Sequence, residues 1–146
     1  MTTRYFALTI GILYLLIGGI GFFPGMVSAP LVDAPPVAAD TGYGYLLGLF
    51  PVNVLLNMLH LTIGISALIA YRSLSQSISF ARGLAMIFGI LAVMGMLPWA
   101  STAFGLVPLF GHNVWLHALT AAAAAYVGFA SPMEALPGEL AARRAS

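Results

Sequence analysis

Two histidines in apolar surroundings, His60 and His117, are the residues of this chain best suited to chemistry. An imidazole can bind a metal or exchange a proton near neutral pH. Polar groups within long apolar segments are costly in lipid, so they are expected to be buried against protein. We expect these histidines and the asparagines near them to form one buried polar cluster. Its predicted members are Asn53, Asn57, His60, Asn113 and His117.

One face of a helix carries much of this cluster. Asn53, Asn57, His60 and Gly64 are separated by four, three and four residues. Residues three and four apart are neighbours on a helix surface, so this spacing predicts a single polar stripe.

Three interpretations of the histidines are open. In the first, neutral His60 and His117 hydrogen-bond to Asn57, Asn113 or a backbone carbonyl and hold helices together, which requires no cofactor. In the second, they are axial ligands, because two imidazoles at one depth suit a haem and one suits the magnesium of a chlorophyll. In the third, a histidine serves a proton or quinone site. No carboxylate lies within the apolar segments to assist that third role.

The sequence lacks the residues that other common catalytic and metal sites require. The chain has no cysteine, which excludes thiolate sites. Its four carboxylates lie outside the apolar segments, so the ligands of a di-iron bundle are missing. Phosphate-loop, nucleophile-elbow and zinc-protease motifs are also absent. The sequence therefore predicts no catalytic residue and no metal site, and it favours a protein that is not an enzyme.

The elements that position the histidines are predicted to be membrane helices. Of 146 residues, 61% are hydrophobic and 6% are charged, against about 25% charged in an average soluble domain. Lysine is absent and the net charge is +1, which excludes nucleic acid as a partner. The segments 5–32, 41–71 and 83–133 carry no charge. Since a span needs about 20 residues, the first two hold one span each and the third holds two.

The predicted fold is therefore an all-α integral membrane protein, a bundle of four transmembrane helices. The helices are expected near 5–23, 45–71, 80–99 and 114–130, within one domain over 1–131. Residues 24–44 form a proline-rich external loop, and 132–146 form a tail. The start resembles a signal peptide with a cleavage site at Val27-Ser28-Ala29, but the apolar run Phe6–Phe23 is too long for one. His112 is assigned a capping or interfacial role, and Asn113 is the predicted N-cap of the last helix.

Arginine placement predicts the orientation. With four spans, all five arginines fall on one side, which the positive-inside rule makes cytoplasmic together with both termini. They are Arg4, Arg72, Arg82, Arg143 and Arg144. Trp99 and Trp115 then lie at the outer interface. The expected location is a bacterial inner or thylakoid membrane, with lipids and either other integral membrane subunits or a second copy as partners.

An internal repeat links the two halves of the chain. The order Gly-Leu-x-Pro, Asn, Leu-His, Thr occurs from Gly48 and again from Gly105, and Gly-Ile-Leu occurs at 11–13 and 89–91. This pattern predicts two duplicated helical hairpins related by an axis along the membrane normal. His60 lies 12 residues before Arg72 and His117 lies 14 before Ser131. At about 1.5 Å per residue, both histidines should lie at a similar depth.

The stretch Gly48–Leu68, GLFPVNVLLNMLHLTIGISAL, together with Trp115-Leu116-His117, resembles the bacterial four-helix membrane family called domain of unknown function 4383. The resemblance extends from about Tyr5 to Phe129. It implies four spans and a broad bacterial distribution, cyanobacteria included, and it implies no activity. The layout is also similar to that of DoxX-like proteins, at the level of fold alone.

The function expected from these patterns is that of a small non-catalytic subunit beside a larger respiratory, photosynthetic or transport complex. Small and adaptable side chains on the third predicted helix suit such packing. They are Gly83, Met86, Gly89, Met94, Gly95 and Met96. The alternatives are a haem- or chlorophyll-binding or redox protein that uses His60 and His117, and a membrane enzyme that handles a quinone or another small molecule.

Overall fold

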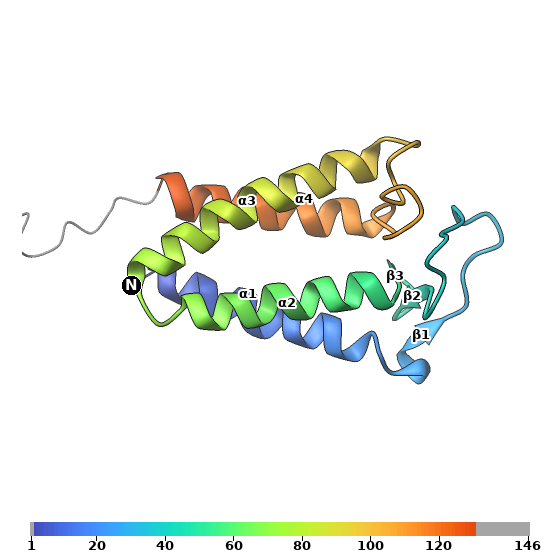
Figure 1. The fold of residues 1–146 in the computed structure, drawn as a ribbon, viewed down its shortest axis with the longest axis horizontal. Helices are drawn as coiled ribbons and strands as arrows, with labels where there is room; N and C mark the ends of the chain where they lie inside the picture. Colours follow the sequence, from blue (N-terminus) through green and yellow to red (C-terminus); the bar gives the residue numbers. More distant parts are fainter. Residues whose placement is uncertain (1, 131–146) are drawn as a thin grey trace, which may run out of the picture.

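The computed structural model describes residues 2–130, and the chain is mostly helical (Figure 1). The helices are α1 (Thr2–Ile20), α2 (Val54–Ala70), α3 (Leu74–Met96) and α4 (His112–Ala125), with a π-helical segment (Tyr126–Ala130) after α4. The four predicted helices are therefore confirmed. The predicted tail 132–146, with Arg143 and Arg144, lies outside the described residues.

The helices form two antiparallel hairpins that lie side by side (Figure 1). The first hairpin is α1 with α2 and the second is α3 with α4, and the most extensive helix contacts lie within the hairpins. The hairpins meet through α3, which packs against both α1 and α2. The chain passes from α2 to α3 through a tight turn at one end of the bundle, and the long connections lie at the other end, called the loop end below.

Glycines allow α1 and α2 to approach closely. A Cβ atom on Gly18 would lie 2.8 Å from the carbonyl oxygen of Asn57, and one on Gly64 would lie 2.8 Å from the backbone nitrogen of Leu15. Real Cβ atoms do not come this close to backbone atoms, so these positions require glycine. Small residues at helix interfaces permit such backbone contact in membrane proteins.

The start of α2 differs from the prediction. Residues 44–52 do not extend the helix back to Tyr45; they form strands β2 (Gly44–Leu46) and β3 (Phe50–Val52). With β1 (Val27–Ser28) these strands make an antiparallel sheet of order β1-β2-β3, so the expectation of an all-α chain is wrong at the loop end.

The physical reasons for this difference lie in the sequence between the strands. Leu47 and Gly48 have positive φ angles of 52° and 72°, which turn the chain. Pro51 cannot donate a helical hydrogen bond and disfavours helical geometry in the residue before it. Asn53 then starts α2, because its side chain accepts a hydrogen bond of 2.9 Å from the amide of Leu56.

Two other helix starts also differ from the prediction. The third helix begins at Leu74 rather than near residue 80, because the hydroxyl of Ser73 caps it by accepting from the amide of Gln76. The fourth begins at His112 with Gly111 as its N-cap, at φ 63°, and Gly111 makes no side-chain bond. The prediction of Asn113 as the N-cap is therefore wrong. Asn113 lies inside the first turn, where its side chain is free to bond elsewhere.

The bundle buries several polar side chains beside its apolar core and exposes large apolar side chains on its outside. Among the buried side chains are Asn53, Asn57, His60, Asn113, His117 and Thr120. Large apolar side chains of the helices are exposed, among them Ile12, Leu16, Ile65, Ile69, Met86, Ile90, Val93 and Leu119. Two helical segments, Thr3–Ile20 and Leu74–Met96, are long and apolar enough to cross a membrane, and α2 is a shorter apolar helix.

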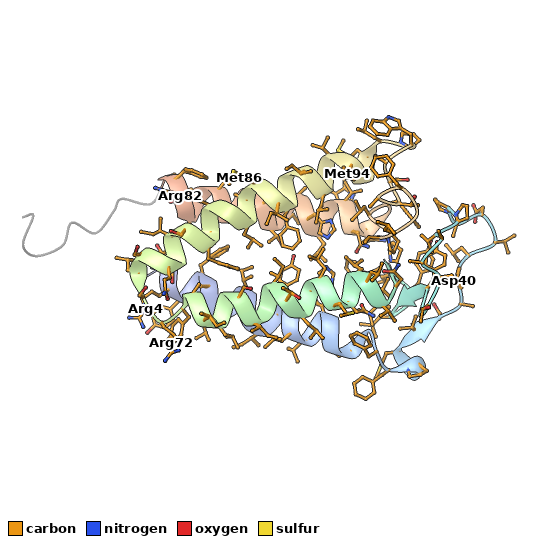
Figure 2. All side chains as sticks on the ribbon, viewed as in Figure 1. Arg4, Asp40, Arg72, Arg82, Met86 and Met94 are labelled. Atoms are coloured by element: carbon orange, nitrogen blue, oxygen red, sulfur yellow. The ribbon has the colours of Figure 1, made fainter. Side chains whose placement is uncertain are left out.

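The charges gather at the ends of the bundle. Arg4, Arg72 and Arg82 lie at the end with the α2–α3 turn, and Asp40 lies at the loop end (Figure 2). The middle of the bundle, between these charged ends, holds the histidines.

Candidate functional site

His60 and His117 meet in the middle of the bundle. Their ring centroids are 6.1 Å apart, and the rings meet edge to face at an angle of 67°. His60 comes from α2 and is 1% exposed, and His117 comes from α4 and is fully buried. Histidines 57 residues apart in the sequence therefore lie at one level along the bundle, and their depth in a membrane stays a prediction.

Two aromatic rings complete the surroundings of the histidines. Tyr14 lies 5.1 Å from His60, edge to face, and Phe88 is stacked on His117 at 5.0 Å with an angle of 11°. Tyr14 and Phe88 are also stacked, with centroids 5.2 Å apart. Each helix thus contributes one ring to a buried group of four, called the central quartet below: Tyr14, His60, Phe88 and His117.

The polar atoms of the histidines have no partners. Within residues 2–130, neither Nδ1 nor Nε2 of His60 or His117 makes a hydrogen bond, and the same holds for Oδ1 of Asn57 and of Asn113. An unpaired buried polar group costs about 1–3 kcal/mol. The bonds between histidine and asparagine that the first interpretation expects are thus not formed, so these histidines do not join helices by hydrogen bonds among the described residues.

The asparagines, in contrast, tie the helices to the loops. Asn57 Nδ2 donates to the carbonyl of Gly21 at 2.8 Å. Asn113 Nδ2 donates to the carbonyls of Pro51 and Pro108, at 2.6 and 2.8 Å. These bonds fix both amide groups through their nitrogens and leave their oxygens unused.

Asn53 belongs to a different site from the histidines. Its Nδ2 donates to the carbonyls of Ala39 and Leu106, at 2.9 and 2.7 Å, and its Oδ1 caps α2. The predicted polar cluster therefore has two parts: Asn53 holds the loops, whereas His60 and His117 meet in the quartet.

Tyr14 and Thr120 link the first and last helices. The Tyr14 hydroxyl lies 2.8 Å from Thr120 Oγ1, and both side chains are buried. Sequence reasoning missed Tyr14 and Phe88. The available signal was that each is an aromatic residue in the middle of an apolar helix, the tyrosine with a hydroxyl that needs a partner when buried.

His112 lies apart from the quartet at the loop end. Its Nδ1 is 3.2 Å from the carbonyl oxygen of Leu49, and its ring meets Phe50 edge to face at 5.9 Å. The residue is exposed and connects the start of α4 to the turn before β3. His112 is thus the first residue of α4 and Gly111 is its N-cap, so the predicted capping role is not found and the interfacial role stays a prediction.

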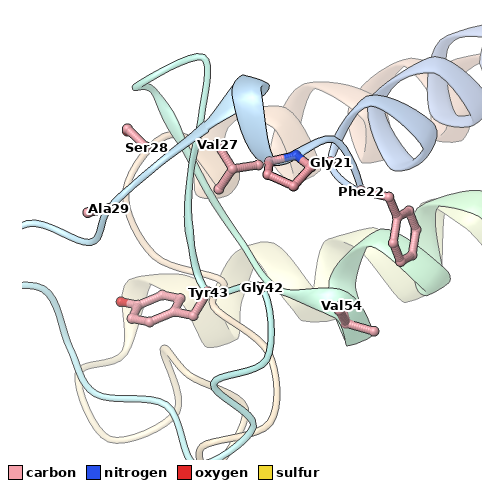
Figure 3. Close-up of a pocket in the computed structure, with 9 residues that line it drawn as sticks. Gly21, Phe22, Val27, Ser28, Ala29, Gly42, Tyr43 and Val54 are labelled. Atoms are coloured by element: carbon pink, nitrogen blue, oxygen red, sulfur yellow. The ribbon is translucent and has the colours of Figure 1, made fainter.

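A hollow of about 290 Å³ opens at the loop end, between the end of α1 and the sheet (Figure 3). Its lining includes Phe22, Val27, Tyr43 and Val54, and neither histidine of the quartet takes part. Tyr43 donates to the carbonyl of Pro35 at 2.8 Å, and burial raises the pKa of its phenol above the usual value. The phenol therefore stays protonated as a donor, which suits a structural role.

The two hairpins share unusual local features. Leu47 and Gly48 precede α2 with positive φ angles, and Phe104 and Gly105 precede α4 in the same way, at 59° and 89°. Each pair lies 57 residues from its counterpart and comes shortly before a proline.

A second shared feature lies at the opposite end of the bundle. Arg4 Nε donates to the carbonyl of Tyr71 at 2.8 Å, and Arg82 Nε donates to that of Gly128 at 2.8 Å. Each guanidinium also lies over an aromatic ring, that of Tyr71 at 5.1 Å and that of Phe129 at 5.2 Å. In both hairpins the first helix therefore holds the end of the second through an arginine.

A family model described as Domain of unknown function (DUF4383) matches residues 4–130. No curated protein and no solved structure matches the chain.

Proposed function

The chain belongs to the family described as Domain of unknown function (DUF4383), and from the geometry of its histidine pair we propose that it is a four-span integral membrane protein that binds one small ligand between His60 and His117. The proposal has two parts, the membrane topology and the binding site, and each has its own support and its own test.

The distribution of side chains supports the topology. Large apolar side chains are exposed along the helices while several polar side chains are buried, a distribution that suits lipid on the outside. Arg4, Arg72 and Arg82 lie together at one end, so this end is cytoplasmic by the positive-inside rule. Trp99 and Trp115 are exposed, as expected of residues at the outer interface. The membrane is a bacterial inner or thylakoid membrane.

The matching features of the hairpins support their origin by duplication. The same backbone turn precedes α2 and α4, and the same arginine contact closes each hairpin. Duplication accounts for a histidine at one depth in both halves, because each hairpin brings its own. The site is then formed only where the two hairpins meet.

A labelling experiment tests the topology. The chain has no cysteine, so single cysteines can be introduced without background. Ser73→Cys in the α2–α3 turn should react with a membrane-impermeant maleimide only after the membrane is opened. Thr102→Cys at the loop end should react in intact cells or right-side-out vesicles. The opposite labelling would overturn the proposed orientation.

One observation carries the binding site: two imidazoles in contact with all four ring nitrogens unpartnered in the described part of the chain. A bundle that needed packing alone would gain from leucine at both positions, because an apolar side chain leaves no polar group unpaired. Ionisable residues within a membrane are costly and mark functional sites. A ligand that pairs these nitrogens removes the cost.

Native mass spectrometry tests for that ligand. The protein is purified in mild detergent without chelators and compared with the His60→Leu/His117→Leu double variant. The wild type should carry an extra mass that the double variant lacks, and His112→Leu should keep it as the matched control. Equal bare masses for all three proteins would overturn the proposed site.

The tetrapyrrole alternative meets a packing obstacle. Phe88 stacks on His117 and Tyr14 contacts His60, so both rings occupy space that a haem or chlorophyll would need. A visible absorption spectrum of the purified protein decides the matter. A Soret or chlorophyll band that disappears in His60→Ala or His117→Ala would favour a tetrapyrrole as the ligand.

An accessory subunit role is a second candidate, favoured by the outer side of α3. A Cβ atom on Gly83 or Gly89 would meet no other atom within 4 Å, and Met86 between them is exposed. These glycines do not serve packing within the bundle, so they suit close contact with a helix of another subunit. Gly83→Leu/Gly89→Leu should then reduce the size of the native complex extracted in mild detergent. An unchanged size would count against this candidate.

A further inference from the structure

We infer that a groove at the end of α1 binds one acyl chain of a phospholipid from the outer leaflet of the membrane. This inference rests on the membrane topology of the proposed function and does not involve the histidine pair. The lining of the groove, the lengths of the helices beside it and its backbone hydrogen bonds each support it.

Two hollows at the end of α1 form the groove. The first is the hollow of about 290 Å³ between α1 and the sheet (Figure 3). The second has a volume of about 410 Å³, and Pro24 lines both. The other residues of the second hollow are Ile20, Phe23, Gly25 and Met26. Hollows of about 300–1,000 Å³ with apolar linings are typical of small-molecule sites.

The lining offers a ligand apolar surface and no free hydroxyl. Within the described part of the chain, no charged residue lines either hollow. The hydroxyl of Tyr43 donates to the carbonyl of Pro35. Ser28 Oγ donates to the carbonyl of Tyr45 at 3.2 Å. A ligand of this groove is therefore held by contact with apolar side chains, as a hydrocarbon chain is.

Helix lengths place the groove within the outer leaflet. Under the proposed topology, Arg4 and Arg72 mark the cytoplasmic boundary. Ile20 ends α1 16 residues after Arg4. Val54 begins α2 18 residues before Arg72. At about 1.5 Å per residue, both helices end roughly 24–27 Å from that boundary, whereas the hydrocarbon core is about 30 Å thick. The groove between these helix ends therefore lies at the level of the outer acyl chains.

The backbone around the groove finds its partners inside the protein, as non-helical backbone within a membrane must. Asn57 Nδ2 donates to the carbonyl of Gly21, which belongs to the lining of the first hollow. The amide of Leu47 donates to the carbonyl of Met26 at 2.8 Å. The three strands beside the groove pair with one another. Asn57 thus supplies the donor that water supplies to the carbonyls of an exposed loop.

Large apolar side chains at the groove are exposed. They are Phe22, Phe23, Met26 and Leu47. The chain carries no charge between Arg4 and Asp33, so these side chains continue the apolar outer face of α1. Apolar patches of this kind mark contact with a membrane or with another protein. Because the patch lies at the level of the acyl chains, lipid is the expected partner.

The charged part of the same connection lies farther out. Asp33 and Asp40 belong to the segment between β1 and β2, which extends beyond the sheet and away from the helices (Figure 1). Val32, next to Asp33, is fully exposed. We expect this segment to reach water while the groove stays among lipids, so Val32 provides a control position.

Tryptophan fluorescence tests the position of the groove. Trp99 and Trp115 are replaced by phenylalanine, and a single tryptophan is introduced at Phe22, Leu16 or Val32. In vesicles of phosphatidylcholine brominated on its acyl chains, Phe22→Trp and Leu16→Trp should be quenched. Val32→Trp should instead be quenched by iodide in the water. Quenching of Phe22→Trp by iodide and not by bromine would overturn the inference.

Retention in detergent separates a bound chain from bulk lipid. Protein extracted from the brominated vesicles is purified in a mild detergent without added lipid. Phe22→Trp should stay quenched, because its lipid remains in the groove. Leu16→Trp should recover its fluorescence, because Leu16 is exposed on α1 and lines neither hollow. Equal recovery by both proteins would overturn the bound chain.

Filling the groove should displace the lipid. A Cβ atom on Gly25 would meet no atom within 4 Å, and Ala29 of the first hollow is exposed, so both positions have room for a larger side chain. In the Phe22→Trp protein, Gly25→Leu/Ala29→Leu should remove most of the retained quenching. Gly19→Leu is the matched control, because its Cβ also meets nothing within 4 Å and it lines neither hollow. Unchanged quenching in the filled variant would contradict the groove as the site.

The outcomes separate this inference from the proposed function. A phospholipid mass that His60→Leu/His117→Leu retains supports the groove, whatever binds between the histidines. Loss of the retained quenching, with Ser73→Cys and Thr102→Cys labelled as expected, would overturn the groove and leave the topology. Labelling of Ser73→Cys from the outside would overturn the topology, and the position of the groove in the outer leaflet with it.

Discussion

The loop end and the middle of the bundle both bury polar side chains, and they treat them in opposite ways. At the loop end, Asn53 uses both ends of its amide, with donors on two carbonyls and its oxygen on an amide of α2. In the middle, His60 and His117 leave every ring nitrogen unpaired among the described residues. The fully hydrogen-bonded amide of Asn53 holds chain segments in place, whereas the unpaired ring nitrogens of the histidines are free to bind the proposed ligand. Under the proposed function, this contrast separates a structural polar residue, Asn53, from the two histidines of the ligand site.

The largest effect is expected at the loop end. Asn53→Ala removes an N-cap and leaves the carbonyls of Ala39 and Leu106 without their donor. Loss of the cap and of two partly buried hydrogen bonds should lower the free energy of unfolding by about 2–4 kcal/mol. Unfolding in mixed micelles of increasing denaturing detergent measures this change. A loss below about 1 kcal/mol would mean that the loop end is not held by Asn53.

The next effect concerns the contact between α1 and α2. Gly18→Ala places a Cβ atom 2.8 Å from the carbonyl oxygen of Asn57, so the helices must separate. Overpacking of this kind costs about 1–3 kcal/mol. Gly19→Ala is the matched control, because its Cβ would meet nothing within 4 Å. The same unfolding measurement should show a loss for Gly18→Ala alone, and equal losses would contradict the assigned helix contact.

A smaller effect is expected where the quartet is hydrogen-bonded. Tyr14→Phe keeps the ring that packs on His60 and Phe88 but removes the 2.8 Å contact with Thr120. The expected loss is about 0.5–1.5 kcal/mol, the net worth of one hydrogen bond. Ligand binding should persist, because the proposed site uses the ring nitrogens of His60 and His117 and not the Tyr14 hydroxyl. A variant that folds and loses the extra mass in native mass spectrometry would show that the hydroxyl belongs to the site.

The sequence predicts the helices well and the loop end poorly, for physical reasons. Four apolar helical segments admit few arrangements in a membrane. The Leu-His repeat was enough to predict that His60 and His117 lie at one level along the bundle. The strands around Gly48 and Pro51 were missed because an apolar run such as residues 44–52 fits both helix and strand. Their conformation depends on contacts with β1 and with residues far along the chain, such as the bond from Asn113 to Pro51.

Two of the four residues of the central quartet were predictable from the sequence. His60 and His117 stand out by residue type, since few ionisable side chains occur in the apolar helices. Tyr14 and Phe88 do not stand out, because aromatic residues in apolar helices commonly face lipid as well as protein. Only the packing of the first and third helices against the others brings their rings to the histidines. The unpaired state of the nitrogens is a property of the assembled bundle and has no counterpart in the sequence.

Replacement of both histidines is expected to change the stability least, and it tests the difference between Asn53 and the histidines most directly. In ligand-free protein, His60→Leu/His117→Leu should change the free energy of unfolding by less than about 1 kcal/mol, or should raise it. The reason is that apolar side chains of similar size replace groups that make no hydrogen bonds among the described residues, which is close to neutral or stabilising. Protein that retains the extra mass found by native mass spectrometry should then be more stable than ligand-free wild type, and the double variant should show no such difference, since only the native wild type binds the ligand. A decrease of 3 kcal/mol or more in the free energy of unfolding without any ligand would show that the histidines stabilise the fold as Asn53 does. The proposed difference between the loop end and the middle of the bundle would then be wrong.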